Sequence, residues 1–396
     1  MLKTKTLVGL DILRFFMALI MVIFHIPSVL TIQFFKFNGW YATSTFFILS
    51  GFILTYVYQN RILKNDFSNS EFLIKRLATL YPIHILTLAF YILQLPYSHF
   101  IKQKPLFPIE VSYQQLPNTP PLPSTDSYIL QFSDYFQYIV ESLLLVHAWD
   151  WRYLLMNGPS WSISALLFFY CIFSFLVKKI SKIKHIELFT FILWLAILTL
   201  PIYLIITENF ANETIGLLHR NPLLLTPSFI AGICLFYLSI KHKAFINKHR
   251  WALRIIGLSG FYICFKLIQY NSYQTFYLTH NGLFLLMQMA LIAGFMNFEV
   301  KTIKIASLWQ KLGRTSLTIY MCHFPAMIIF FKLTGFQPND ENPLNHSQLV
   351  VFLTILVVIS YLLQTYIFTP LQRYLSKKLI KVRAINHYHP TQSNSL

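Results

Sequence analysis

Ten apolar segments, each long enough to cross a lipid bilayer, constrain this chain more than any other feature of its sequence. A membrane-spanning helix needs about 20 predominantly apolar residues. The segments cover residues 8–30, 41–60, 77–96, 161–177, 186–207, 221–240, 255–272, 281–298, 315–333 and 348–370. Inside a bilayer the backbone must satisfy its own hydrogen bonds, so we expect these segments to be α-helices. The predicted fold is therefore an all-α membrane protein with about ten transmembrane helices.

The composition agrees with a chain that faces lipid. Of the 396 residues, 56% are hydrophobic and only 12% are charged, whereas soluble domains carry about 25% charged residues. So few charges cannot cover the water-exposed surface of a chain of this length, which excludes soluble enzymes. The first apolar segment contains Asp11, Arg14 and His25, so we expect it to stay attached as a span and not to be cleaved as a signal peptide.

The basic residues predict how the chain crosses the membrane. The net charge of +18 comes mainly from clusters of Lys and Arg between the apolar segments, and such clusters lie on the cytoplasmic side of membrane proteins. With both termini cytoplasmic, 24 of the 32 Lys and Arg residues fall in cytoplasmic segments. No cluster is interleaved with aromatic residues outside a predicted span, so we expect membrane lipids and no nucleic acid as partners.

The longest predicted outer segment covers residues 97–160. A crossing at residues 133–149 would move the basic cluster at residues 178–184 to the outside, so we expect 133–149 to be re-entrant or interfacial on the outer side. The part before it should form an extended lid or linker, because it contains Pro105, Pro108, Pro117, Pro120, Pro121 and Pro123. We expect a membrane domain over residues 1–380 and a polar cytoplasmic tail over residues 381–396.

Three ionisable residues in the first span point to function, because burying such groups in a membrane is costly. Arg14 and His25 are eleven residues apart, close to three helical turns, so both project from one face about 16 Å apart along the axis. Asp11 can pair with Arg14. A cation near the cytoplasm can bind an anionic donor, and a deeper imidazole can take a proton from a hydroxyl or carry an acyl group.

The same residues permit other interpretations. Arg14 could extend its charge to the membrane surface, and His25 could be a hydrogen-bonded structural histidine. In a different class of protein, a transporter of glycans or small acids, Asp11, Arg14 and His25 would form a proton relay. Such a transporter would show flux that depends on a proton gradient.

Six motifs resemble those of the acyltransferase 3 family of multi-pass bacterial acyltransferases, which includes O-acetyltransferases of lipopolysaccharide O-antigen and other surface glycans. They are LDILRFFMALIMVIFH at residues 10–25, FFILSGFILTYVY at 46–58, FLIKRLATLYP at 72–82, NGPSWSIS at 157–164, LGRTSLTIYMCHFP at 312–325 and FTPLQRYLSKK at 368–378. The first contains the family's arginine, followed after ten residues by a histidine. The matches extend from about residue 7 to residue 380 in the family's order.

The resemblance implies an O-acyltransferase of the bacterial inner membrane that transfers an acetyl group. Acetyl-CoA would bind from the cytoplasm near Arg14, Lys75 and Arg76. The acceptor would be a hydroxyl of a surface glycan or of a lipid-linked sugar, reached from the periplasmic side. His25, with Arg14 as its catalytic partner, would act as general base or as a transient acyl carrier. By charge alone, Lys75 and Arg76 could equally be topological determinants.

The remaining motif residues are implied to bind the substrate: Trp161, Ser162, Tyr320 and His323. Each also has a structural interpretation. Trp161 could belong to an interfacial aromatic belt, Ser162 could bond to nearby backbone, and Tyr320 and His323 could make structural hydrogen bonds. The sequence contains no HExxH, GxSxG or Walker motif, so we expect no metal cofactor and neither hydrolase nor ATPase chemistry.

The sequence departs from the family at two positions. Thr79 stands where the family's basic motif has a second arginine, three residues after Arg76, and Leu166 lies in the region where the family's WSLSxE motif supplies a glutamate. Glu141 or Asp150 of the outer segment could replace that carboxylate. These departures leave a third interpretation open, a membrane partner that binds coenzyme A without transferring a group.

Overall fold

A computed structural model describes most of the chain. The described residues are 7–27, 38–102, 109–112, 127–150, 154–210, 212–270, 273–336 and 342–388. The six prolines of the expected lid or linker lie outside these ranges, as do residues 389–396 of the expected tail.

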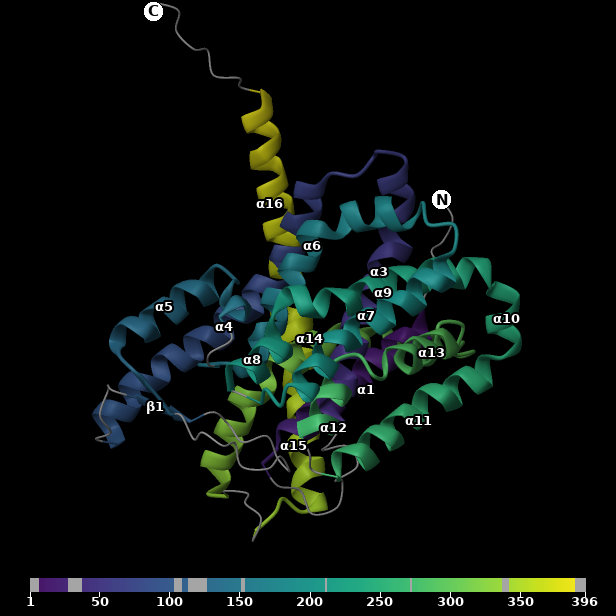
Figure 1. Cartoon of the computed structure of the whole chain (residues 1–396). Helices are drawn as coiled ribbons and strands as arrows, with labels where there is room; N and C mark the ends of the chain where they lie inside the picture. The colour runs from purple at the N-terminus through teal and green to yellow at the C-terminus, as the bar shows by residue number, and fades with distance from the viewer. Residues whose placement is uncertain are drawn as a thin grey trace, which may run out of the picture.

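The chain is an all-α membrane protein, and the ten predicted spans are confirmed as helices long and apolar enough to cross a membrane. Seven are single helices: α1 (Val8–His25), α3 (Gly39–Leu63), α4 (Asn69–Lys102), α6 (Trp161–Ile180), α7 (Ile186–Ile206), α11 (Arg250–Ile268) and α14 (Ile303–Thr334). Two are helix pairs: α8 (Asn212–Arg220) with α9 (Pro222–Lys241), and α12 (Tyr273–His280) with α13 (Leu285–Phe295). The last combines α15 (His346–Leu362), a π-helical turn η3 (Leu363–Phe368) and α16 (Thr369–Tyr388), which projects from the bundle (Figure 1). A short helix, α10 (Lys243–Lys248), connects α9 to α11.

Two spans are broken near the points where the sequence predicted their beginnings. Helices α8 and α9 meet at Asn221, whose side chain accepts a hydrogen bond from the first turn of α9, and Pro222, which has no N–H to donate. The turn between α12 and α13 contains Gly282 with a φ of +94°, a conformation that glycine adopts without strain. The predicted ranges 221–240 and 281–298 therefore left out the first half of each span, which is α8 in one case and α12 in the other.

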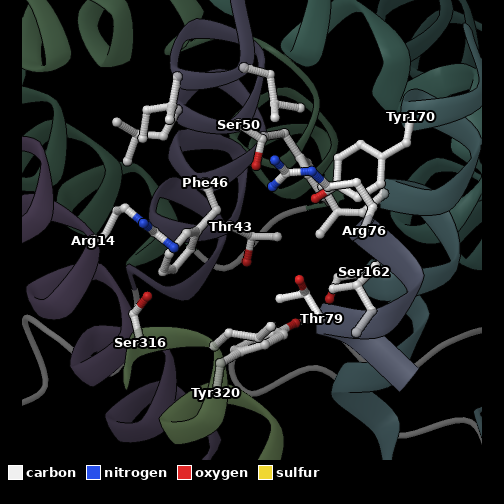
Figure 2. Close-up of a pocket in the computed structure, with 17 residues that line it drawn as sticks. Arg14, Thr43, Phe46, Ser50, Arg76, Thr79, Ser162, Tyr170, Ser316 and Tyr320 are labelled. Atoms are coloured by element: carbon white, nitrogen blue, oxygen red, sulfur yellow. The ribbon is translucent and has the colours of Figure 1, made fainter. Parts of the chain in front are cut away.

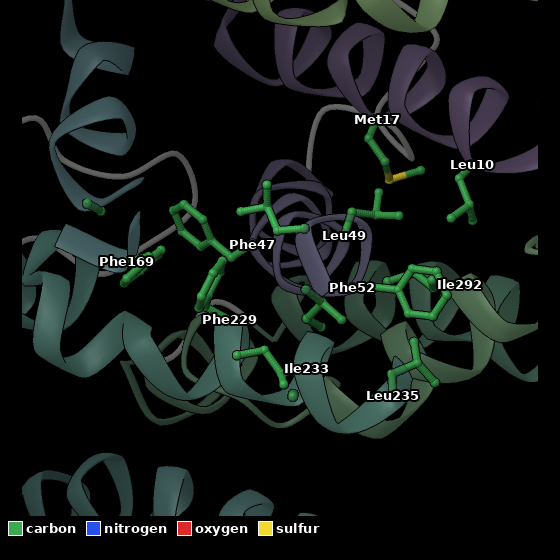
Figure 3. Packing of buried hydrophobic residues seen from close by; sticks show 14 of the residues in the cluster. Leu10, Met17, Phe47, Leu49, Phe52, Phe169, Phe229, Ile233, Leu235 and Ile292 are labelled. Atoms are coloured by element: carbon green, nitrogen blue, oxygen red, sulfur yellow. The ribbon is translucent and has the colours of Figure 1, made fainter. Parts of the chain in front are cut away.

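Helix α3 crosses α9 at a pair of glycines. A Cβ atom on Gly232 would lie 2.0 Å from the carbonyl oxygen of Ile48, and one on Gly51 would lie 2.1 Å from that of Phe229. The backbones can approach this closely only because neither glycine has a side chain. Buried Phe52 and Phe229 pack beside the crossing with side chains from α1, α6 and α13 (Figure 3). This crossing leaves another face of α3 free to line the cavity described below.

The stretch predicted to be re-entrant or interfacial forms α5 (Phe132–Leu143) and a 3₁₀ turn, η1 (His147–Trp149). With 12 residues, α5 is about 18 Å long and cannot cross a hydrocarbon core of about 30 Å. It lies at the edge of the bundle beside α4 (Figure 1), and its position relative to the bilayer stays a prediction. Two strands, β1 (Ile109–Ser112) and β2 (Ser127–Leu130), pair antiparallel ahead of it, which the sequence did not predict.

Two buried histidines attach the segment that contains α5 and η1 to the bundle. His84 Nε2 of α4 donates to the carbonyl oxygen of Ser142 at 2.9 Å, and His147 Nε2 lies 3.0 Å from Ser160 Oγ in a second 3₁₀ turn, η2 (Gly158–Ser160). The two imidazole rings stack 5.8 Å apart. Burial, helped by the neighbouring His84, lowers the pKa of His147 to about 3. The His147 ring is therefore neutral at neutral pH.

Candidate functional site

A cavity of about 180 Å³ lies inside the bundle among α1, α3, α4, α6 and α14. Its polar lining consists of Arg14, Thr43, Ser50, Arg76, Thr79, Ser162, Tyr170, Ser316 and Tyr320 (Figure 2). Its apolar lining consists of Phe46, Phe47, Leu49, Ile53, Leu54, Leu80, Leu166 and Leu317. Four of the candidate residues from the sequence, Arg14, Arg76, Ser162 and Tyr320, therefore face one space.

Helical spacing explains how each helix presents several side chains to this cavity. On α6, Ser162, Leu166 and Tyr170 follow one another at intervals of four residues, which places them on one face. On α4, Arg76 and Thr79 share a face for the same reason. Local sequence thus aligns the side chains on each helix, and tertiary packing brings the five helices together.

Arg14 reaches the cavity from the contact between α1 and α14. Its Nη1 lies 3.9 Å from Asp11 Oδ1, so the expected pairing of these two residues is present, with 30% and 23% of the two side chains exposed. A Cβ atom on Gly313 of α14 would lie 2.6 Å from the Cβ of Asp11. The two helices therefore touch here, and this contact places Asp11 beside the cation.

Arg76 approaches the cavity from the opposite side (Figure 2). Its Nη2 donates to Tyr58 Oη at 3.0 Å, and the guanidinium carbon lies 5.2 Å from the ring centroid of Phe72 and 6.0 Å from that of Tyr170. These aromatic contacts orient the cation without neutralising it. No Asp or Glu occurs among the described lining residues. Two guanidinium groups therefore give the cavity a positive potential that suits an anionic ligand.

Unlike the two arginines, three other motif positions contribute no charge to the cavity: Lys75, Thr79 and Leu166. Lys75 pairs with Glu71 and does not line the cavity, so its contact with a donor stays a prediction. Thr79, where the resemblance expects a second arginine, lines the cavity and accepts a hydrogen bond at 2.6 Å from Gln372 Nε2 of α16. Leu166 also lines the cavity, which makes this wall apolar where the resemblance expects a carboxylate.

His25 lies against His323 of α14, which is 298 residues away in the sequence. His323 Nδ1 faces the carbonyl oxygen of Tyr320, which can only accept, so Nδ1 carries the proton of the neutral ring and Nε2 is a bare acceptor. That Nε2 lies 3.0 Å from His25 Nδ1, which also donates to the carbonyl oxygen of Met21 at 2.8 Å. The proton of His25 is thus held on Nδ1, and its Nε2 has no hydrogen-bond partner among the residues that the structure describes.

Tyr320 connects the cavity to this histidine pair, although neither histidine lines the cavity. Its ring lies 5.9 Å from that of His323. Its hydroxyl donates to the carbonyl oxygen of Pro159 at 3.2 Å, and Ser162 Oγ donates to the same oxygen at 2.9 Å. Both hydroxyl protons are engaged with backbone, so each oxygen can still accept a hydrogen bond from a ligand.

Trp161 does not line the cavity but packs next to it. Its ring lies 6.0 Å from that of Phe47, a lining residue, and 4.9 Å from that of His219. Only 5% of Trp161 is exposed. This burial inside the bundle does not fit a residue of an interfacial aromatic belt.

Several residues near the site were not identified from the sequence. Tyr170 could have been found, because it lies eight residues after Ser162 on the same helical face. Gln372 lies in the FTPLQRYLSKK motif but was not singled out, and His219 and His280 gave no local signal. Each of the three meets its partners only through tertiary packing. In the described ranges, no group of three or more His, Cys, Asp or Glu side chains could hold a metal ion.

A family model described as an acyltransferase domain matches residues 7–365. The match includes all five helices that line the cavity and both members of the His25–His323 pair. No curated protein and no solved structure matches the chain.

Proposed function

The chain belongs to the acyltransferase 3 family of membrane acyltransferases, and on that premise we propose that it is an O-acetyltransferase. The proposed donor is acetyl-CoA, bound from the cytoplasm. The proposed acceptor is a sugar hydroxyl of a cell-surface glycan, such as lipopolysaccharide O-antigen, and the proposed location is the bacterial inner membrane.

One observation carries this proposal: two guanidinium groups face one cavity, and a histidine with a free lone pair lies beyond it. Guanidinium groups bind phosphate oxygens through paired hydrogen bonds, so Arg14 and Arg76 suit the phosphates of coenzyme A. Helix α1 carries both Arg14 and His25, about 16 Å apart along its axis. One rigid element would therefore set the distance between the donor's phosphates and the reacting group.

The lone pair on His25 Nε2 supports two routes of transfer. In direct transfer, Nε2 removes the proton of the acceptor hydroxyl while the hydroxyl oxygen attacks the thioester carbonyl. The C–O bond forms, the C–S bond breaks, and coenzyme A leaves as a thiolate that takes the proton from His25. In the other route, Nε2 attacks the carbonyl, so that a C–N bond forms, the C–S bond breaks and coenzyme A leaves as a thiolate. The acceptor hydroxyl then attacks the acetyl group, the C–N bond breaks, and the hydroxyl proton passes to the thiolate.

For His323, the contacts support a role that acts through His25. Its side chain is completely buried, and both ring nitrogens are engaged, Nδ1 with Tyr320 and Nε2 with His25. We therefore propose that His323 is a positioning residue that keeps the proton of His25 on Nδ1.

Mass spectrometry of surface glycans tests the proposed function. Cells that lack the protein should lose the mass of one acetyl group per repeat unit, and the wild-type chain should restore it. His25→Ala should not restore it, because the variant has neither base nor acyl carrier. The control is His185→Ala, which changes an exposed histidine in the turn between α6 and α7 and should restore acetylation. Near wild-type acetylation by His25→Ala would show that these roles are wrong.

Unchanged glycans in cells without the protein would favour one of the other two hypotheses. Binding of labelled acetyl-CoA to the purified protein then separates them. The inactive partner would bind it, whereas a transporter with Asp11, Arg14 and His25 as proton relay would not.

A further inference from the structure

Four helices bring two indole and two imidazole rings together beside the site. They are Trp40 of α3, Trp161 of α6, His219 of α8 and His280 of α12, called here the histidine–tryptophan cluster. The ring of Trp40 lies 4.2 Å from that of His219 and 4.0 Å from that of His280, and Trp161 lies 4.9 Å from His219. Trp40, Trp161 and His280 are 8%, 5% and 9% exposed, whereas His219 is half-buried. Apart from Trp161, no motif and no step of the proposed transfer involves these residues.

Both histidines of the cluster lie where a span is broken. His219 is in the last turn of α8, and His280 is the last residue of α12. Within a membrane, backbone that departs from a helix is tolerated where it is buried in protein or lines a cavity. Breaks within membrane-spanning helices form the substrate sites of several membrane protein folds. The breaks therefore favour a ligand site over simple helix packing.

His280 presents an unpaired acceptor inside the cluster. Its Nδ1 lies 2.7 Å from the carbonyl oxygen of Phe276 and 3.0 Å from Thr279 Oγ1. A carbonyl oxygen can only accept, so Nδ1 carries the proton of the neutral ring. Nε2 is buried and has no hydrogen-bond partner within the described part of the chain. Because Nδ1 bonds back to α12, Nε2 points away from that helix, and a buried acceptor of this kind is stabilised when a ligand donates to it.

The cluster is adjacent to the reacting histidine. The ring of Phe24 lies 4.9 Å from that of His25 and 5.9 Å from that of Trp40. His219 is close enough to both His25 and His280 to interact with them electrostatically. His25 and His219 each keep accessible surface. A ligand held by the cluster would thus lie within reach of His25 Nε2.

We propose that the histidine–tryptophan cluster is the acceptor subsite and that its ligand is a neutral, polyhydroxylated ring, the chemistry of a sugar. This inference rests on the proposed O-acetyltransferase activity. The C–H face of a sugar ring is apolar and packs against an indole face, while a hydroxyl donates to a bare imidazole nitrogen. An anionic ligand does not suit His280 Nε2, because its oxygens cannot donate.

Acetyl transfer by the purified full-length protein in proteoliposomes tests the subsite. The donor is labelled acetyl-CoA, and the acceptor is lipid-linked glycan extracted from cells that lack the protein. His280→Phe keeps a ring against Trp40 but removes the acceptor nitrogen. We expect the KM for the glycan to rise about tenfold, the effect of one lost hydrogen bond, and the KM for acetyl-CoA to stay unchanged.

Three further variants test whether the change in the KM for the glycan comes from the histidine–tryptophan cluster. His280→Gln offers an amide oxygen as acceptor and should recover most of the affinity for the glycan. His219→Phe should raise the KM for the glycan as His280→Phe does. The matched control, His185→Phe, makes the same exchange at an exposed histidine between α6 and α7 and should behave as the wild type.

The possible outcomes separate this inference from the proposed function. An unchanged KM for the glycan in both His280→Phe and His219→Phe overturns the subsite while leaving the activity standing. Loss of acetyl-CoA binding in these variants, with no recovery in His280→Gln, would show that the two histidines have a structural role. That result overturns the acceptor subsite as well. If the wild-type protein transfers no acetyl group to the glycan, the proposed function fails and the subsite fails with it.

Discussion

At the residue scale, hydrogen bonds decide what His25 can do. Met21 and His323 hold its Nδ1 proton, so the other ring nitrogen is free to act as base or nucleophile. Arg14, on the same helix, is oriented by a contact with Asp11 at 3.9 Å. The two groups that the sequence singled out are thus each positioned by a neighbour, and for His25 this neighbour comes from another helix.

Replacing His323 tests this positioning. His323→Leu should lower the kcat of acetyl transfer at least about tenfold, because His25 loses an acceptor that keeps its proton on Nδ1. The KM values for acetyl-CoA and glycan should not change, since His323 does not line the cavity. His323→Gln, whose amide oxygen can accept from His25, should recover part of the kcat. A raised KM with an unchanged kcat would instead support the direct substrate contact that the family resemblance implies.

At the element scale, glycine and proline decide how the helices meet. Gly313 lets α14 touch α1 at Asp11, and Gly232 lets α9 cross α3. Asn221 and Pro222 separate α8 from α9, which places the end of α8 against Trp40 and Trp161. Close crossings hold the helices that line the cavity, and the breaks place side chains beside it.

The crossing of α3 and α9 can be tested with one methyl group. Gly232→Ala should lower the free energy of unfolding by about 1–3 kcal/mol, because the new Cβ would lie 2.0 Å from the backbone oxygen of Ile48. Thermal unfolding of the detergent-purified protein measures the change. Gly158→Ala is the control, since its Cβ would meet nothing within 4 Å. Equal unfolding midpoints for the two variants would contradict so close a crossing.

At the scale of the whole molecule, the fold places two kinds of chemistry side by side. Five helices enclose a cavity with two cations, and four helices, α3 and α6 again among them, form the histidine–tryptophan cluster near His25. In the predicted topology the cations lie nearer the cytoplasm, where acetyl-CoA is made, and the cluster lies nearer the outside. This arrangement suits a transfer in which donor and acceptor arrive from opposite sides.

Reporter fusions test that orientation. Green fluorescent protein fused after Tyr388 should fluoresce, because the Lys and Arg clusters predict a cytoplasmic C-terminus. Alkaline phosphatase, which becomes active only outside the cytoplasm, should be active when inserted after Leu143, between α5 and η1. Activity of the phosphatase at the C-terminus, together with fluorescence from an insertion after Leu143, would reverse the predicted topology.

The sequence by itself determined the ten spans, the family and the residues of each motif. These features depend on patterns within one segment: the length of an apolar run, the helical spacing of Arg14 and His25, or the order of a motif. The predicted spans agree with the helices because backbone hydrogen bonding inside a bilayer leaves the chain few alternatives. Asn221 and Pro222 are a local signal for the break between α8 and α9, although α8 itself was not predicted as part of that span.

Only the tertiary structure decided which of these side chains meet. His25 and His323 are 298 residues apart and form one hydrogen-bonded pair, while Lys75, next to Arg76 in the sequence, turns to Glu71 instead of the cavity. Of the cluster's four members only Trp161 had a sequence signal, because Trp40, His219 and His280 join it from three other helices. Such contacts depend on how whole helices pack against one another, and no pattern within a single helix encodes that packing.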